Sequence, residues 1–194
     1  MAIDDNTVNI KSYHHGDLRA ALIEEGLRLL ALSDAEHLSL REVARNVGVS
    51  ATAVYRHFPD KQALLSALAQ RGGDMLAEQQ LQAQTAAGGG AAGFEATGAT
   101  YVRFALAHPA IFRLMMARTR EDALAGSDDV CLTGLGLLRQ NIAALAAPGT
   151  SNEEQRIQAV KAWAIVHGLA MLMLDGQVPA DDALIDRVVK SASL

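Results

Sequence analysis

Apolar residues recur every three or four positions along most of the chain, which is the period of a helix buried on one side. Leu18, Leu22, Leu29 and Leu30 form one such stripe and predict a helix over residues 15–32. Alternating runs of β-branched and polar residues, which indicate strands, do not occur. The pattern predicts an all-α fold, with further helices over residues 61–87, 94–107, 152–174 and 180–190 and a short helix that begins at Pro109.

The stretch 39–58 predicts two short helices joined by a tight turn. Ser39 followed by Glu42 is the pattern of a capping box, in which each side chain satisfies a backbone N–H group of the other residue at a helix start. Gly48 can adopt the left-handed conformation that ends a helix, and Ser50 can cap the next one. The inner stripe comprises Leu40, Val43, Ala44 and Val47 on the first helix, and Ala53, Val54 and Phe58 on the second.

Two helices joined by a glycine-containing turn form a helix-turn-helix, whose second helix enters the major groove of DNA. The outward positions of the second helix suit that task. Ala51 and Thr52 are small enough for the backbone to approach base edges, and Thr52 can bond a base or contact a thymine methyl group. Tyr55, Arg56 and His57 can reach phosphates. The predicted DNA-binding residues are Ser39, Arg41, Ser50, Ala51, Thr52, Tyr55, Arg56, His57 and Lys61.

These residues resemble the TetR family of bacterial transcription regulators. The resemblance covers residues 13–70 and lies in Val49-Ser50, the run Val54-Tyr55-Arg56-His57-Phe58, and Lys61 ahead of Leu64-Leu65. Residues 108–112 and Trp163 with His167-Gly168 further resemble a subgroup with a Trp-His-Gly signature. The resemblance implies an N-terminal three-helix helix-turn-helix domain over residues 1–70, and a C-terminal helical domain for ligand binding and dimerisation over residues 71–194.

The resemblance also implies a C-terminal cavity whose ligand alters the spacing of two DNA-reading surfaces. Methionine side chains adapt to irregular shapes, so a cavity rich in them suits a small apolar ligand. The same residues at helical spacing also suit an ordinary packed core, and His167 can serve either as a ligand donor or as a satisfied buried histidine. The predicted ligand-binding residues are Tyr101, Phe104, Phe112, Met115, Met116, Trp163, His167 and Met171.

A further apolar pattern indicates self-association. Cys131, Leu135, Leu138, Ile142 and Leu145 recur at spacings of four, three, four and three residues, as in a heptad seam. From residue 162 the helix over 152–174 is apolar on nearly every side, and such a helix must be covered all round. Because a chain of 194 residues has few elements left for this, we expect a second copy to cover it. The predicted dimer interface comprises Cys131, Leu135, Leu138, Ile142, Leu145, Ile165, Leu169 and Leu172.

Three segments are expected to interrupt or loosen the helices. The glycine-rich stretch 85–93 predicts a flexible linker, and no Lys-Ser or Lys-Thr pair follows its glycines as in a phosphate-binding loop. The polar stretch 121–129 predicts a loop. Gly72-Gly73 is expected to loosen the helix over 61–87, which is the element that joins the two halves.

Charge and composition limit the choice of partners. The net charge of −5 disfavours nucleic acid, yet residues 41–61 carry four basic and two acidic side chains, a local balance of +2. DNA binding needs a basic face and not a basic total, and a dimer would double the phosphate contacts. The single cysteine fits a reducing cytoplasm. Neither a signal peptide nor a fully apolar run of about 20 residues is evident.

The side chains predict neither catalysis nor a metal site. The histidines are scattered, and the adjacent His14 and His15 point apart on any regular backbone, with no third ligand near. We therefore predict no enzyme and no cofactor. We expect a cytoplasmic, bacterial, homodimeric transcriptional regulator, a repressor that a small apolar ligand releases from a palindromic DNA operator. The alternative is a helical protein-interaction module without a ligand response.

Overall fold

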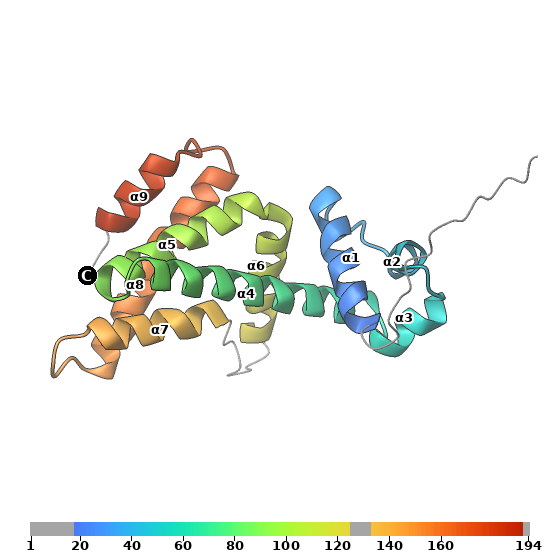
Figure 1. Ribbon diagram of the computed structural model, residues 1–194, viewed down its shortest axis with the longest axis horizontal. Helices are drawn as coiled ribbons and strands as arrows, with labels where there is room; N and C mark the ends of the chain where they lie inside the picture. The colour runs from blue at the N-terminus through green and yellow to red at the C-terminus, as the bar shows by residue number, and fades with distance from the viewer. Residues whose placement is uncertain (1–17, 125–132, 192–194) are drawn as a thin grey trace, which may run out of the picture.

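The computed structural model describes residues 18–124 and 133–191, and within these ranges the chain is built from helices and turns. The all-α prediction is confirmed. Figure 1 shows α1, α2 and α3 grouped at one end, α5 to α9 at the other, and α4 running between the two groups. The helices are α1 (Leu18–Leu32), α2 (Leu40–Val47), α3 (Ala51–His57), α4 (Lys61–Ala86), α5 (Gly90–Ala107), α6 (Pro109–Leu124), α7 (Thr133–Leu145), α8 (Asn152–Leu174) and α9 (Asp182–Ser191).

The N-terminal helices pack through the stripes that the sequence predicts, and their buried residues are continuous with the apolar core of the C-terminal group. Val43 of α2 and Val54 of α3 are buried against Leu22 and Leu30 of α1. Phe58 closes this core just after α3, and the guanidinium carbon of Arg19 lies 5.5 Å from the centre of its ring. Removing these apolar side chains from water stabilises the small domain by about 1.5–3 kcal/mol for each large residue.

The predicted helix ends are largely confirmed. The Ser50 side chain accepts a hydrogen bond from the backbone N–H of Ala53 (3.2 Å), and the Asp60 carboxylate accepts one from the N–H of Ala63 (2.7 Å). Gly48 ends α2 in the left-handed conformation, with φ of 80°. At the start of α8, Ser151 and Glu154 form a reciprocal capping box.

The capping box predicted at Ser39 is wrong. Ser39 precedes α2 in an extended conformation, but its side chain makes no capping hydrogen bond. The Glu42 carboxylate instead pairs with Arg45 one turn further on, at 3.2 Å. An acidic side chain in the first turn still interacts favourably with the helix dipole, so Glu42 keeps part of its stabilising effect.

Gly72 and Gly73 do not interrupt α4, which is continuous from Lys61 to Ala86. Both glycines are buried where α6 crosses α4. A Cβ atom on Gly72 would lie 2.5 Å from Cγ2 of Ile111 and 2.9 Å from Sδ of Met115. The missing side chain therefore allows the two helices to approach closely, and its role is packing.

The two predicted loops are shorter than expected. The linker predicted over 85–93 is a tight turn, because α4 runs to Ala86 and α5 already begins at Gly90. Gly88 and Gly89 supply the positive φ angles that the turn requires, 81° and 72°. The helix from Pro109 is not short: α6 extends to Leu124, into the stretch predicted as a loop, and residues 125–132 lie outside the described residues.

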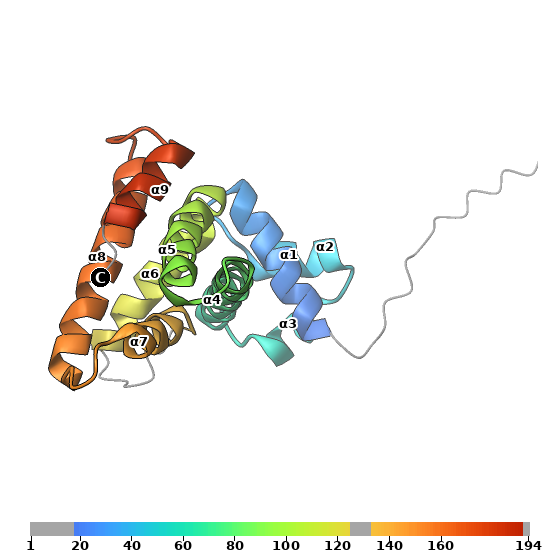
Figure 2. The same ribbon diagram turned by 60° about the vertical axis from the view of Figure 1, so that its left-hand side comes forward.

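Helix α8 begins as predicted at residue 152 and ends at 174. By length and composition alone it could cross a membrane, but it packs along α5 and α7 within the bundle (Figure 2), and its first turn carries Glu153 and Glu154. Its outward side is apolar and uncovered in a single chain: Ile157, Val160 and Leu172 are among the most exposed large apolar residues described. We call these residues, with Gly168, the α8 outer face.

The close crossing of α4 and α6 generates the first prediction. We expect Gly72→Ala to lower the free energy of unfolding by about 1–3 kcal/mol, the usual cost of overpacking, because Ile111 is buried and stiff at χ1. Thermal and urea unfolding followed by circular dichroism measure the change. Gln79→Ala, at an exposed position of the same helix, is the control. Equal stability of Gly72→Ala and wild type would contradict the packing role.

Candidate DNA-reading surface and ligand cavity

Helix α3 presents its predicted outer face to solvent. Ala51, Thr52, Arg56 and His57 are exposed, and Tyr55 keeps 46% of its surface accessible. The inner positions of the helix are anchored, since Val54 and Phe58 are almost fully buried. The helix is thus fixed by one side and offers a small residue, a hydroxyl, a phenol and two basic groups on the other.

The remaining predicted DNA-binding residues differ in their surroundings. Arg41 is exposed on α2, whereas Ser39 is half-buried before it. The Ser50 hydroxyl oxygen caps α3. The Lys61 ammonium donates to the backbone carbonyl of Glu36 in the connection between α1 and α2, so it holds α4 against the N-terminal group. An ammonium has three donors, and its contact with a phosphate stays a prediction.

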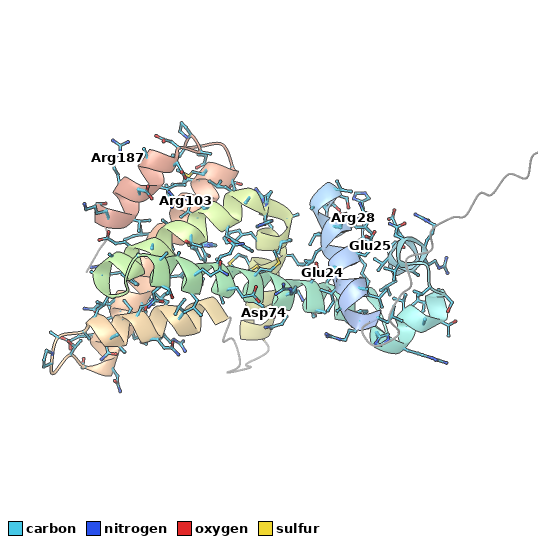
Figure 3. All side chains as sticks on the ribbon, in the orientation of Figure 1. Glu24, Glu25, Arg28, Asp74, Arg103 and Arg187 are labelled. Carbon is cyan, nitrogen blue, oxygen red and sulfur yellow. The ribbon has the colours of Figure 1, made fainter. Side chains whose placement is uncertain are left out.

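A polar network that the sequence pattern did not indicate fixes α2 on α1. The Glu25 carboxylate accepts from Asn46 at the end of α2 (2.7 Å) and from Arg28 of its own helix (2.7 and 2.8 Å). Figure 3 shows Glu25 and Arg28 on the side of α1 that faces α2. The hydrogen bonds from Arg28, followed by that from Asn46, lower the pKa of Glu25 against the opposing effect of burial. This carboxylate thereby orients the helix-turn-helix.

The C-terminal group encloses a cavity of about 70 Å³ between α4, α5, α6, α7 and α8. We call it the central cavity. Its lining residues are mostly apolar, and they comprise Gly73, Leu76, Gln80, Phe94, Glu95, Thr97, Gly98, Tyr101, Met115, Met116, Leu137, Leu138, Ala162, Trp163, Val166 and Val189. Among them are four of the residues predicted to bind ligand: Tyr101, Met115, Met116 and Trp163.

The other four predicted ligand residues do not line this cavity. Phe104 and Phe112 are packed in the core, with 1% and 0% of their surface exposed, and they belong to the wall behind it. His167 and Met171 lie further along α8 and are half-buried. Their burial and their absence from the lining of the central cavity agree with the core interpretation, and their contact with a ligand stays a prediction.

Tyr101 is the centre of a hydrogen-bonded chain at the cavity wall. The indole N–H of Trp163 donates to the Tyr101 hydroxyl (3.3 Å), which lies 3.0 Å from Nδ1 of His167. The Tyr101 oxygen accepts from the indole, so its own proton is available to Nδ1 of a neutral His167 or to Sδ of Met116, which lies 3.9 Å away. Burial lowers the pKa of His167 in agreement with this state. Burial also raises the pKa of Tyr101 to about 12, although the bond from Trp163 opposes the shift.

The predicted dimer residues do not form one exposed seam. Ile142 is 1% and Leu169 is 7% exposed in the isolated chain, and Ile142 lies at the hollow between α7 and α8; their place in the interface stays a prediction. Leu138 faces the central cavity, and Leu145 and Ile165 are half-buried. Leu172 is 41% exposed. Cys131 lies outside the described residues, and nothing is described of the Leu135 side chain.

Comparison with known families assigns both halves of the chain. The family model for bacterial regulatory proteins of the tetR family matches residues 22–68. The model for the tetracyclin repressor-like C-terminal domain matches residues 94–192, about half of the chain. The chain belongs to the TetR family.

Several solved structures share the fold of this chain. A protein with unknown function from Rhodococcus sp. RHA1 matches it at 34% identity and a TM-score of 0.76, with 94% of each chain covered. A tetR-family transcriptional regulator from Streptomyces coelicolor shares the fold at 22% identity and a TM-score of 0.65, over 90% of this chain and 78% of that one. The multidrug binding protein EbrR, complexed with imidazole, shares it at 15% identity and a TM-score of 0.65, over 92% and 91%.

This member of the TetR family is therefore a transcriptional regulator with a DNA-binding helix-turn-helix and a C-terminal ligand-binding domain, and it is not an enzyme. Regulators of this family are soluble cytoplasmic proteins that bind DNA operators, form dimers and bind ligands. The subgroup suggested by Trp163, His167 and Gly168 stays a prediction.

The raised pKa of Tyr101 generates the second prediction. A phenol whose pKa is higher in the folded state binds its proton more tightly there, so its contribution to stability is complete below pH about 10 and is lost as pH rises toward about 12. We expect the wild type to lose more free energy of unfolding than Tyr101→Phe between pH about 9.5 and about 11.5, by on the order of 1–2 kcal/mol. Urea unfolding of both proteins at each pH measures the difference. Parallel pH profiles would contradict it.

Proposed function

We propose that this TetR-family protein is a homodimeric repressor that a small apolar ligand releases from a palindromic operator. The observation that carries the proposal is the position of α4. One end of this helix directly follows α3, and its middle supplies Gly73, Leu76 and Gln80 to the wall of the central cavity. A molecule in the cavity therefore contacts α4, and α4 directly follows α3 with its DNA-reading surface.

The exposed face of α3 supports major-groove binding. Ala51 and Thr52, in its first turn, are the residues suited to base edges, and recognition helices contact bases with their N-terminal residues. Tyr55, Arg56 and His57 follow as phosphate partners. We include Ser39, Arg41, Ser50 and Lys61 as further phosphate contacts, since all four lie on α2, on α3 or at the adjoining helix ends.

Helix α6 supplies a second route from the cavity to the DNA-reading surface. Met115 and Met116 line the cavity, and Arg118 on the same helix donates to the Gln62 side chain (3.0 Å) and contacts Ser66, both in the first turns of α4. We infer that ligand favours a position of α6 and α4 in which the two α3 helices of a dimer no longer match successive major grooves. Only a difference in affinity for the two geometries can produce this release.

The α8 outer face is the proposed dimer interface. Ile157, Val160 and Leu172 expose apolar surface there, and a Cβ atom added at Gly168 would meet nothing within 4 Å in the single chain. The small side chain at Gly168 would let a partner helix approach closely. A hollow of about 460 Å³ between α7 and α8 borders this face at Val160 and could receive partner side chains.

The proposal divides the chain functionally at residues 1–70 and 71–194, for DNA binding and for ligand binding with dimerisation. This division falls inside α4, which is one unbroken helix. We place the protein in the bacterial cytoplasm, where its operator would lie.

The DNA-reading surface is tested by Thr52→Ala and Tyr55→Ala. Each is expected to weaken operator binding by roughly fivefold to hundredfold, since one good base contact contributes about 1–3 kcal/mol. Operator fragments are first selected from random DNA with the wild-type protein, and affinity is then measured by gel shift at several salt concentrations.

Gln79→Ala, at an exposed position of α4 outside both proposed surfaces, is the matched control and should bind as the wild type. Unchanged binding by both α3 variants would contradict the assignment of the reading helix. Failure of the wild type to select any DNA, or binding that does not fall steeply with salt, would favour the alternative of an interaction module.

The proposed interface is tested by Val160→Glu combined with Leu172→Glu, which places charges on an apolar contact. We expect monomers in analytical ultracentrifugation and operator binding weakened by at least tenfold, with unchanged helicity by circular dichroism. Arg187→Glu, at an exposed position of α9, changes the net charge by the same two units and is the control. A dimer that persists in the Val160/Leu172 variant would place the interface elsewhere.

A further inference from the structure

The central cavity shares a wall with the hollow between α7 and α8. Leu138 on α7 and Trp163 on α8 line both spaces. A side chain that lines two spaces lies between them, so these two residues separate the cavity from the hollow. The volumes differ, at about 70 Å³ for the cavity and about 460 Å³ for the hollow. Because a cavity of about 150 Å³ holds one benzene molecule, the body of a ligand fits the hollow, whereas the central cavity admits only a narrow group.

The indole of Trp163 is a wall that can move. The side chain is half-buried, and its N–H donates to the Tyr101 hydroxyl over 3.3 Å. This distance exceeds the usual N–H···O distance of about 2.9–3.0 Å, so the bond holds the ring weakly. The central cavity lies on one side of the ring and the hollow on the other. Turning the ring about its side-chain bonds would therefore connect the two spaces.

The walls of the hollow are apolar and basic. The apolar lining residues are Leu138, Ile142, Ala143, Ala159, Val160 and Trp163. Each helix adds one arginine, Arg139 from α7 and Arg156 from α8, and no acidic residue is in the described lining. An apolar molecule with one negative group matches this surface, whereas an amine would meet two positive charges.

The two arginines differ in how far their charge is already used. The Arg156 guanidinium donates to the Glu153 carboxylate of its own helix at 2.9 and 3.0 Å. For Arg139, which is exposed, no hydrogen bond or ion pair occurs within the described part of the chain. Its guanidinium can therefore bind a carboxylate through two parallel N–H···O bonds, the strong geometry for this pair.

We propose that the hollow and the central cavity form one ligand site for a straight-chain carboxylate. The carboxylate pairs with Arg139, the alkyl chain lies along the hollow to Trp163, and the end of the chain enters the central cavity past the turned indole. This inference rests on the proposed role of the central cavity as the ligand site, and it adds the chemical class of the ligand. Val160 belongs to both the hollow and the α8 outer face, so a partner subunit on that face would cover the bound chain.

Three probes with the same alkyl chain test the class: octanoate, 1-octanol and octylamine at neutral pH. Isothermal titration calorimetry measures the affinity, and the emission of Trp163, the only tryptophan of the chain, reports contact with the shared wall. We expect octanoate to bind about fivefold more tightly than 1-octanol, because its head group alone forms a charge-assisted pair with Arg139. Octylamine should bind most weakly.

One variant with a matched control locates the head group. Arg139→Gln should weaken octanoate about fivefold, to the affinity of 1-octanol, and leave 1-octanol unchanged. Arg187→Gln makes the same replacement at an exposed position of α9 that lines neither space, and it should bind as the wild type.

A second variant locates the end of the chain. In the wild type, affinity should rise from butanoate through hexanoate to octanoate, by up to about fourfold for each buried methylene. Ala162 lines the central cavity and not the hollow, so Ala162→Leu fills the cavity and should abolish the gain from hexanoate to octanoate. Ala117→Leu, exposed on α6, is the matched control. Circular dichroism and the melting temperature verify that each variant folds.

The outcomes separate this inference from the proposed function. The inference is overturned if 1-octanol or octylamine binds as tightly as octanoate, if Arg139→Gln binds octanoate as the wild type does, if Ala162→Leu keeps the gain with chain length, or if no probe gives a saturable signal. Gel shifts with the selected operator then test release. Release by 1-octanol but not by octanoate would support the proposed function and overturn the inference. Octanoate that binds as expected without weakening operator binding would support the inference and contradict release.

Discussion

The close contact of α4 with α6 is the constraint on which the rest of the arrangement depends. Helix α4 extends from the N-terminal group into the C-terminal group. Its position is fixed where other helices pack against it. Gly72 allows Ile111 and Met115 to pack directly against its backbone, and Arg118 donates to Gln62, about three turns earlier on α4. Packed helices of this kind move as units, because close-packed interiors transmit displacement with little loss.

Polar side chains link neighbouring helices of the C-terminal domain. Gln80 and Gln84, one turn apart on α4, bond to Thr97 on α5 and to Asn141 on α7, respectively. Nearby, Arg103 on α5 pairs with Asp182 and Asp186 on α9 at the surface, where Figure 3 shows it directed toward that helix. Apolar packing alone specifies relative helix positions loosely, and these directed bonds select one register.

Much of the fold follows from local rules, and the departures have physical causes. The caps at Ser50, Asp60 and Ser151 were predictable because they need only a side chain and a backbone three residues apart. At Ser39 the expected box does not form, because the Ser39 side chain makes no capping bond and Glu42 pairs with Arg45. Gly72 was misread as a weak point, since a sequence cannot reveal that Ile111, distant along the chain, occupies the space of its missing side chain.

The residues of the candidate site also include some that could be predicted from the sequence and some that could not. The outer face of α3 follows from helical period alone, so its exposed residues could be predicted. An apolar residue of the C-terminal half can line a cavity or fill the core, and its sequence position does not separate the two; Phe104 and Phe112 are almost fully buried and do not line the central cavity. Gln80 was missed because a lone glutamine in a polar stretch resembles a surface residue until its burial is known.

The uncovered apolar side of α8 affects how operator occupancy depends on the concentration of the protein. If this chain binds its two-fold DNA site as the proposed dimer, mass action makes the occupancy of that site rise more steeply than in proportion to the amount synthesised. Dilution at cell division, or a modest change in synthesis, would then act on gene expression as a threshold. Unpaired copies, with Ile157 and Val160 in water, would be the first to be degraded.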